Sequence, residues 1–552
     1  MKHTLFDTIR FVAGIAAAIA LIGYGLVAEE GISDGRWLAL LGLGWAAAII
    51  AIWPRLPKSW GSFPRAAVKT SFILVSLFAL LMVQLVRIQA VDQASIANRT
   101  GGDPVSGDAL QNPRTVNNDL ALNRGSIYDR NGNLIAGVEI RNGTGYRIYP
   151  DPSTAYVAGY YAPLQYGLTG LEARYDEELR GVAGGNPLSE ALDALLHKEP
   201  QGNNLNLTLD QGLQDTAQDL LGSRTGAVVV IDVKTGATLV LASTPHYDPA
   251  KLVAATKEER DAAATYWNSL LDDPNTPLVL RATEGSLTPG STFKTITAAA
   301  GIDTGAISPS TVYEDYGSLN IGGRELIENN RPDDSIDQWT VSEGFAYSLN
   351  LVFAQIGLDV GATTLTNYAE AFGFGSDIPY DLPIGQSQVA NDSSFLDSQV
   401  ALAETAFGQG QLLATPMQMA LIAACIANDG QMMAPYLVES ITNQDGDVLS
   451  SRDPSVWRTP ISSQTASSMQ DLMVGAVQNG YVSGAAVPGY VVGGKTGTAE
   501  TGSGEPHSWF IGFIGDPEPR YAIAVVLEHG GGEVGAAVSI GQSVLASAIA
   551  AD

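Results

Sequence analysis

The hydrophobic positions of this chain are concentrated in its first 90 residues. Three apolar stretches, residues 11–28, 37–53 and 71–86, alternate there with short polar loops. Each stretch is close to the ~20 residues that an α-helix needs to cross the hydrocarbon core of a bilayer. No small-residue cleavage site follows the first stretch, so the pattern does not indicate a removable signal peptide. Residues 1–90 are therefore predicted to hold three transmembrane helices.

The two loops between these stretches differ in charge. The first loop carries Glu29, Glu30 and Asp34 against a single Arg36. The second loop carries no acid and four cations, which are Arg55, Lys58, Arg65 and Lys69. Because cationic loops stay on the cytoplasmic side of a membrane, we expect a cytoplasmic N-terminus and second loop. Everything after the third helix is then expected outside the cytoplasmic membrane.

Beyond the third stretch the apolar runs become short and alternate with polar residues. Residues 91–123 are rich in Asn, Asp and Gly, which is typical of a linker. Strand-like pieces follow at residues 125–128 and 145–149, and the pair Asn131-Gly132 is a strong hairpin signal. We interpret residues 91–205 as a juxtamembrane linker and a small mixed pedestal module without catalytic residues.

The remainder, residues 206–552, reads as strands, then helices, then strands, then a helix. A helix is predicted at residues 210–221 with Asp210 as its N-cap, and residues 290–430 have helical periodicity. The predicted strands are residues 226–232, 237–243, 490–496, 509–513 and 521–527, with a last helix at 538–550. This order predicts an α+β fold, in which both ends of the domain build one antiparallel five-stranded sheet flanked by helices. An all-helical lobe is inserted between them.

Composition excludes several classes of protein. The 58 acidic and 30 basic residues give a net charge of −28, which argues against nucleic acid or anionic lipid as the main partner. The single cysteine, Cys425, lies in an apolar run, so it is expected to be a buried structural residue, and no disulfide can form within the chain. None of the five histidines has metal-ligand spacing, and we expect neither a metal nor a cofactor.

Three short motifs carry candidate chemistry. The first is Ser291-x-x-Lys294, which follows Pro289-Gly290 at the predicted start of a helix. Residues three apart share a helical face, so the lysine can act as a base for the serine hydroxyl if its pKa is lowered by burial or by another cation. The alternative interpretation of this motif is structural: it only begins a helix, and its lysine is exposed to solvent.

The second and third motifs are Ser348-x-Asn350 and Lys495-Thr496-Gly497. Each has a second copy in the chain, Ser318-x-Asn320 and Lys234-Thr235-Gly236. The first copy is followed by two glycines, and the second lies before the Ser-x-x-Lys motif, so both are interpreted as surface turns. The third motif also completes a phosphate-loop pattern that begins at residue 489. That pattern requires a helix directly after the lysine, whereas the residues here read as a strand, so an ATPase is disfavoured. His507 is interpreted either as lining the site or as a packed residue at a strand edge.

Taken in order, Ser-x-x-Lys, Ser-x-Asn and Lys-Thr-Gly resemble the motif set of the penicillin-binding protein and serine β-lactamase superfamily. Further segments resemble its class B monofunctional transpeptidases: residues 112–114, 124–132, 244–249, 408–410 and 415–416. The resemblance thus extends from about residue 112 to the end of the chain. The chain differs from the family at its N-terminus, because most members have one membrane span and three are predicted here.

The resemblance implies a catalytic role for each motif. Ser291 would attack the carbonyl carbon of a D-Ala-D-Ala stem peptide, and Lys294 would take its proton. Ser348 would relay a proton to the leaving D-Ala, and Asn350 would hold the substrate amide. The terminal carboxylate would be bound by Lys495, Thr496, Gly497 and Thr498. The backbone N–H groups of Ser291 and Thr498 would form the oxyanion hole.

The expected function is therefore a peptidoglycan D,D-transpeptidase that β-lactams acylate. The alternative is a non-catalytic β-lactam sensor or scaffold for wall synthesis, with a D,D-carboxypeptidase or β-lactamase as a weaker alternative. The pedestal leaves no room for a glycosyltransferase domain. The resemblance accordingly implies a partner membrane glycosyltransferase of the SEDS family.

Overall fold

The computed structural model describes residues 2–27, 34–87, 101–102, 109–110, 124–141, 144–183, 201–392, 394–502, 504–531 and 534–551. These residues form two compact units. The first is drawn from Met1–Leu122 and Val182–Pro200, and the second from Asn123–Gly181 and Gln201–Asp552. Most of the predicted linker lies outside the described residues. Within it the structure describes only the short pair β1 (Gly101–Gly102) and β2 (Ala109–Leu110).

The first unit contains three helices that are long and apolar enough to cross a membrane: α1 (Lys2–Val27), α2 (Asp34–Ile52) and α3 (Ser62–Val86). Small residues let α1 and α2 pack closely, since a Cβ on Gly14 would lie 2.7 Å from that of Ala51. The third helix begins earlier than the predicted residue 71. Arg65 and Lys69 therefore lie in its first turns and not in the loop, which long cationic side chains permit at the end of an apolar helix.

The pedestal of the second unit is built on a six-stranded sheet of order β17-β16-β8-β3-β4-β5. Its strands are β3 (Ile127–Tyr128), β4 (Leu134–Arg141), β5 (Thr144–Ile148), β8 (Asn204–Leu207), β16 (Val438–Thr442) and β17 (Val448–Ser451). The predicted hairpin turn is confirmed, because Asp129 accepts hydrogen bonds from the backbone of Asn131 and Asn133 while Gly132 has a φ of +82°. Two of the six strands come from a segment far along the chain.

A buried ionic cluster holds the pedestal together. Glu172 is fully buried and accepts hydrogen bonds from Arg124 at 2.8 Å and from Arg147. Burial alone would raise the pKa of Glu172, but the two guanidinium groups outweigh it and lower that pKa. Arg124 also bonds Asp176 at 2.7 Å, so the start of the described pedestal is fixed to the short helices α7 (Gly170–Arg174) and α8 (Asp176–Leu179).

The remainder of the second unit is organised around a five-stranded sheet of order β10-β9-β21-β20-β19, in which every pairing is antiparallel. The strands are β9 (Gly226–Asp232), β10 (Thr238–Thr244), β19 (Val491–Ala499), β20 (His507–Gly515) and β21 (Pro519–Leu527). The hairpin at residues 233–236 joins the first two as predicted. Both ends of this part therefore build one sheet, which confirms the expected fold class. The last three strands are longer than predicted, and β19 extends beyond the Lys-Thr-Gly motif.

Helices cover both faces of this sheet. On one face lie α10 (Gln211–Leu221), capped by Asp210 as predicted, and α20 (Val534–Ala550). A Cβ on Gly541 of α20 would overlap the ring of Phe510, so the absence of a side chain lets this helix lie flat on β20. The other face is covered by α18 (Pro416–Ala427) and α19 (Ser463–Asn479). Cys425 is buried within α18, and burial raises the pKa of its thiol.

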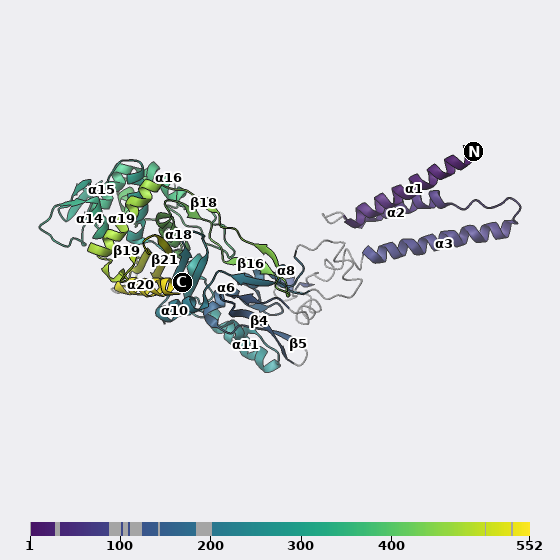
Figure 1. The fold of residues 1–552 in the computed structure, drawn as a ribbon, viewed down its shortest axis with the longest axis horizontal. Coiled ribbons are helices and arrows are strands. Elements are labelled where there is room, and N and C mark those ends of the chain that lie inside the picture. Colours follow the sequence, from purple (N-terminus) through teal and green to yellow (C-terminus); the bar gives the residue numbers. More distant parts are fainter. Residues whose placement is uncertain are drawn as a thin grey trace. The chain divides into compact units, whose positions relative to one another are not determined.

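The inserted lobe is mainly helical and lies at the opposite end of the second unit from β4 and β5 (Figure 1). Its helices are α13 (Lys294–Asp303), α14 (Val341–Ala346), α15 (Asn350–Val360), α16 (Ala362–Ala371) and α17 (Gln399–Ala406). The prediction of an all-helical lobe is wrong, because the lobe also contains two antiparallel strand pairs, β11 (Val312–Glu314) with β14 (Gln338–Thr340) and β12 (Ser318–Ile321) with β13 (Arg324–Ile327). The positive φ angles of Gly322 and Gly323 form the turn between β12 and β13. Helix α11 (Lys257–Leu271) follows β10 in the sequence but lies beside β5 of the pedestal, as both figures show.

Candidate active site

Ser291 lies in a 3₁₀ turn, η4 (Gly290–Phe293), directly before α13. The turn is packed between two other backbone segments. A Cβ on Gly290, where φ is +55°, would lie 2.5 Å from the carbonyl oxygen of Thr498, and a Cβ on Gly408 would overlap the carbonyl oxygen of Gly290. Glycine is required at both positions, and these contacts fix the Ser291 backbone beside β19.

Lys294 begins α13, and its side chain is completely buried. Its Nζ donates hydrogen bonds to the carbonyl oxygen of Ser348 at 2.6 Å and to Oδ1 of Asn350 at 2.8 Å, and it lies 3.3 Å from Ser348 Oγ. Among the described residues no hydrogen bond joins Lys294 to the Ser291 hydroxyl. The structure therefore connects the first motif to the second through the lysine, with the serine held beside it by backbone geometry.

The second motif lies in the connection between α14 and α15. Ser348 has a φ of +60°, a left-handed conformation that is rare outside glycine, and Asn350 is the first residue of α15. Such a conformation persists only where the surroundings enforce it, and it is concentrated at functional sites. The turn places the hydroxyl of Ser348 and the amide of Asn350 on the same side, toward Lys294.

The third motif lies on β19, at the edge of the five-stranded sheet. Lys495 is completely buried, and its Nζ donates hydrogen bonds to Ser348 Oγ at 2.8 Å and to the carbonyl oxygen of Thr496 at 3.0 Å. A Cβ on Gly497 would lie 2.7 Å from the carbonyl oxygen of Pro289, so the strand approaches the Ser291 turn closely. Thr498 follows and is exposed. The three motifs are thus brought to one place.

Burial governs the charge of the two lysines. It lowers the pKa of Lys294 to about 7, although the carboxylate of Glu328 acts in the opposite direction. Burial also lowers the pKa of Lys495 well below its usual value, and the charge of Lys294 lowers it further. Two amines this close repel each other when both are protonated, so a proton on one amine disfavours a proton on the other.

The hydrogen bonds of Lys294 can be made by a neutral amine. A neutral amine has two N–H groups, which suffice for the Ser348 carbonyl and Asn350 Oδ1, and one lone pair that remains for a hydroxyl proton. Lys495 Nζ donates a hydrogen bond to Ser348 Oγ from β19. This arrangement can accept a proton at Lys294 and present a positive charge at Lys495.

The other candidate segments lie where the sequence placed them. Ser318 is on the exposed β12–β13 hairpin, and Lys234 is exposed in the turn between β9 and β10. Lys495 lies within a continuous strand, so the phosphate-loop alternative lacks its helix. His507 is buried at the start of β20, where its Nδ1 accepts a hydrogen bond from the backbone of His529, and no hydrogen bond joins it to the residues of the three motifs. It is a packed strand-end residue.

Sequence reasoning missed two polar residues of this region, Glu328 and Asn330. They lie after β13, in a segment without periodicity or motif spacing, and they bond the backbone around Ser348. Their only sequence signal is a group of polar residues, Glu328-Asn329-Asn330, between β13 and β14. Such a group normally indicates a solvated loop.

Two protein families match this chain. Residues 226–547 match the penicillin binding protein transpeptidase domain, and residues 124–205 match the penicillin binding protein A dimerisation domain. The peptidoglycan D,D-transpeptidase PbpA of Mycolicibacterium smegmatis is 34% identical over 496 residues, covering 85% of this chain and 96% of its own. The D,D-transpeptidase MrdA of Escherichia coli is 30% identical over 68% of this chain and 63% of its own.

Solved structures agree with these matches. Penicillin-binding protein A of Mycobacterium tuberculosis, as a ceftriaxone acyl-enzyme complex, superposes with a TM-score of 0.72 at 32% identity, covering 78% of this chain and 99% of that one. Its penicillin G acyl-enzyme complex superposes with a TM-score of 0.70 at 33% identity, covering 78% and 100%.

The fold and these matches define a penicillin-binding transpeptidase. The chain belongs to the penicillin-binding protein transpeptidase family, as the motifs predicted. Within that family it is homologous to the class B enzymes PbpA and MrdA, and it shares with PbpA the dimerisation domain before the catalytic domain. Its three apolar N-terminal helices are consistent with anchoring in a membrane.

Proposed function

We propose that this serine-type peptidoglycan D,D-transpeptidase uses Ser291 as its nucleophile and Lys294 as the base that activates it. The observation that carries the proposal is the position of Ser348 Oγ, 2.8 Å from the Nζ of Lys495 and 3.3 Å from that of Lys294. A hydroxyl between a cation and a neutral amine can pass a proton between them. Acyl transfer from a peptide needs such a path, because the leaving amine must be protonated.

The first half of the reaction forms an ester. Ser291 Oγ attacks the carbonyl carbon between the two D-Ala residues while its proton passes to Lys294. Backbone N–H groups of Ser291 and Thr498 stabilise the oxyanion, which the close approach of β19 to the Ser291 turn supports. The C–N bond then breaks, and the proton travels from Lys294 through Ser348 to the departing D-Ala amine.

The second half transfers the acyl group to another stem peptide. The amine of that peptide attacks the ester carbon, a new amide forms, and Ser291 recovers its proton. Asn350 uses Oδ1 to accept from Lys294, so its amide N–H₂ remains to hold the carbonyl of the donor peptide. Lys495 with the hydroxyls of Thr496 and Thr498 binds the terminal carboxylate, for which a buried cation and adjacent hydroxyl donors are suited.

β-Lactams acylate the same serine in this proposal. The relatives from Mycobacterium tuberculosis are described as acyl-enzyme complexes with ceftriaxone, imipenem and penicillin G. A β-lactam offers an amide carbonyl for Ser291 and a carboxylate for Lys495, so it fits the roles given to the stem peptide.

We further propose that residues 206–552 form the catalytic domain and residues 91–205 the linker and pedestal, with the N-terminus cytoplasmic and the catalytic domain outside. The cations Arg55 and Lys58 in the α2–α3 loop support this orientation. Glycan polymerisation is then supplied by a membrane glycosyltransferase of the SEDS family. Co-purification of the full chain with such a polymerase from detergent tests this pairing.

Covalent labelling tests the nucleophile. Purified protein is incubated with a fluorescent penicillin, and the adduct is located by peptide mass spectrometry. We expect a stable adduct on Ser291, its loss in Ser291→Ala with an unchanged melting temperature, and unchanged labelling in the matched control Ser318→Ala. Labelling that persists in Ser291→Ala refutes the assignment. A folded wild type that never labels favours the scaffold alternative, and an adduct that hydrolyses within seconds favours a β-lactamase.

A further inference from the structure

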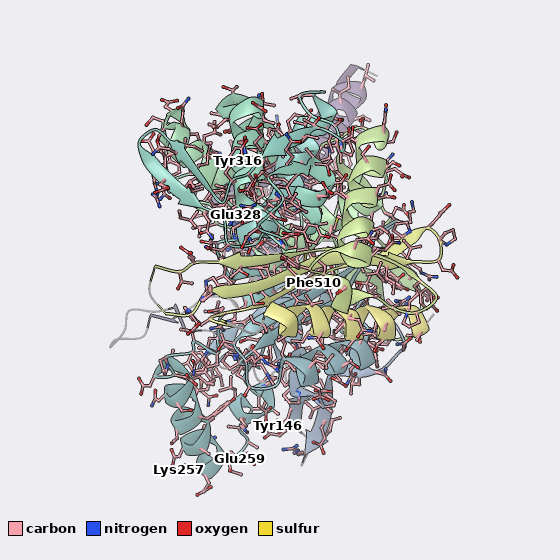
Figure 2. All side chains as sticks on the ribbon, turned by 90° about the vertical axis from the view of Figure 1, so that its left-hand side faces the viewer. Tyr146, Lys257, Glu259, Tyr316, Glu328 and Phe510 are labelled. Carbon is pink, nitrogen blue, oxygen red and sulfur yellow. The ribbon has the colours of Figure 1, made fainter. Side chains whose placement is uncertain are left out.

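The segment after β13 places two polar side chains against the catalytic Ser348 turn. Glu328 is only 7% exposed, and Figure 2 shows it on the side of the sheet occupied by the helical lobe. One of its carboxylate oxygens accepts a hydrogen bond from the backbone N–H of Leu351, and the other accepts one from that of Asn330, each at 2.9 Å. The carboxylate therefore joins this segment to the first turn of α15.

Asn330 completes the connection. Its Nδ2 donates to the carbonyl oxygen of Ser348 at 3.0 Å, the same oxygen that accepts from Lys294 Nζ at 2.6 Å. Its own carbonyl oxygen accepts from the hydroxyl of Tyr481 at 2.9 Å. Asn330 is thus held between the Ser348 turn and Tyr481, whose ring packs against that of Tyr347.

These contacts supply what the Ser348 turn lacks. Helix α15 has no side-chain cap of its own, because its N-cap residue is Leu349. Glu328 provides an acceptor for an otherwise unpaired N–H of the first turn, and its negative charge is favourable at a helix N-terminus. Two donors on the Ser348 carbonyl hold the peptide that follows the left-handed residue, so the hydroxyl is fixed between the two lysines.

We infer that Glu328 and Asn330 are positioning residues for the acylation of Ser291, an inference that rests on the proposed function. Neither touches the reacting atoms. Asn330 acts on the carbonyl of Ser348, and Glu328 acts on the start of α15 and on the segment that carries Asn330. Their loss lets the Ser348 hydroxyl leave the position from which it exchanges protons with Lys294.

Glu328 has a second effect that Asn330 lacks, because it is charged. The titratable groups that face the Lys294 amine are Lys495 from β19 and Glu328 from the segment after β13. The carboxylate raises the pKa of Lys294, whereas burial lowers it. Replacing Glu328 by glutamine therefore moves the acid limb of the acylation rate to lower pH, and replacing Asn330 by alanine leaves that limb in place.

The test measures the second-order rate of acylation by a fluorescent penicillin from about pH 4 to about pH 9. We expect Asn330→Ala to slow acylation about tenfold, because one buried hydrogen bond is lost. The acid midpoint should stay unchanged. We expect Glu328→Gln to slow acylation at least as much and to lower the midpoint. The matched controls are the exposed neighbours Asn329→Ala and Glu325→Gln, for which rate and midpoint stay within about twofold of wild type.

Outcomes separate this inference from the proposed function. If the wild type labels on Ser291 but folded Asn330→Ala acylates at the wild-type rate, the positioning role is refuted and the proposed function stands. If the wild type does not label, the proposed function fails and this inference fails with it. Should Asn330→Ala not fold, Tyr481→Phe removes only the hydroxyl that bonds Asn330, and a slowing of about two- to fivefold is expected. An unchanged rate in that variant refutes the inference.

Discussion

Replacing Lys495 by methionine tests the electrostatic coupling between the two site lysines. Each Nζ lies within 3.3 Å of Ser348 Oγ, so the two atoms are no more than about 6 Å apart. Coulomb's law at that separation, with an effective dielectric constant of about 20, gives roughly 2–3 kcal/mol, or about two pH units in a titration midpoint. The pair therefore loses its first proton more readily than Lys294 alone would.

The acid limb of acylation reports that first proton. In the wild type, burial lowers the pKa of Lys294 to about 7. In Lys495→Met the repulsion between the two amines is gone, so we expect the midpoint to rise by up to about two pH units. Acylation by the variant should also be slower at every pH, because the carboxylate of the β-lactam has lost its cation.

The assay is the labelling rate of purified protein as a function of pH. Lys234→Met is the matched control, since Lys234 has the same Lys-Thr-Gly context but lies exposed in a turn. Its midpoint should equal that of the wild type. A Lys495→Met midpoint equal to or lower than that of the wild type would refute the electrostatic coupling between the two lysines.

Three further predictions follow from the packing. Gly408→Ala should destabilise the protein by about 3 kcal/mol or more in urea unfolding, since it combines a φ of +99° with overlap on Gly290, whereas Gly305→Ala, with a φ of +74° and open space, should cost about 1 kcal/mol. Equal losses of stability in the two variants would show that the close approach of Gly408 to Gly290 is not important for stability. Glu172→Ala leaves Arg124 and Arg147 buried without their anion and should cost roughly 3–5 kcal/mol in the same assay, and a loss below about 1 kcal/mol would show that the cluster is not a net contributor. Cys425 should resist iodoacetamide in the native protein and react fully once it is unfolded, because burial removes access and raises the pKa of its thiol. Rapid native modification would contradict its burial.

The fold was largely predictable because its signals are local. The length of the apolar stretches predicted the three N-terminal helices, and short runs of apolar and β-branched residues predicted the strands of the five-stranded sheet. Asp210 predicted the start of α10. The boundary of α3 was wrong because Arg65 and Lys69 can occupy the end of an apolar helix. The strand order of the pedestal sheet could not be predicted from local sequence, because β16 pairs with β8 although a long segment of the chain, from Leu207 to Val438, separates them.

The candidate site was predictable where it depends on spacing and not where it depends on packing. Ser291 and Lys294 are linked by helical periodicity, but their meeting with Ser348 and Lys495 comes only from the resemblance to known motifs. The contacts that hold the turn were out of reach, because nothing in the local sequence distinguishes Glu328 or Asn330 from residues of a solvated loop. The left-handed conformation of Ser348 likewise has no sequence signal, since serine has no preference for it.

The shared pedestal sheet has a consequence for how the chain reaches its native state. β8 lies between β3 and β16, so one of its edges has no partner until residues 438–442 have emerged and folded back. During synthesis, about 230 residues must appear after β8 before that edge is covered. An excised fragment of residues 124–207 would expose it permanently and would be prone to edge-to-edge association. The pedestal sheet is thus complete only after most of the second unit has been made.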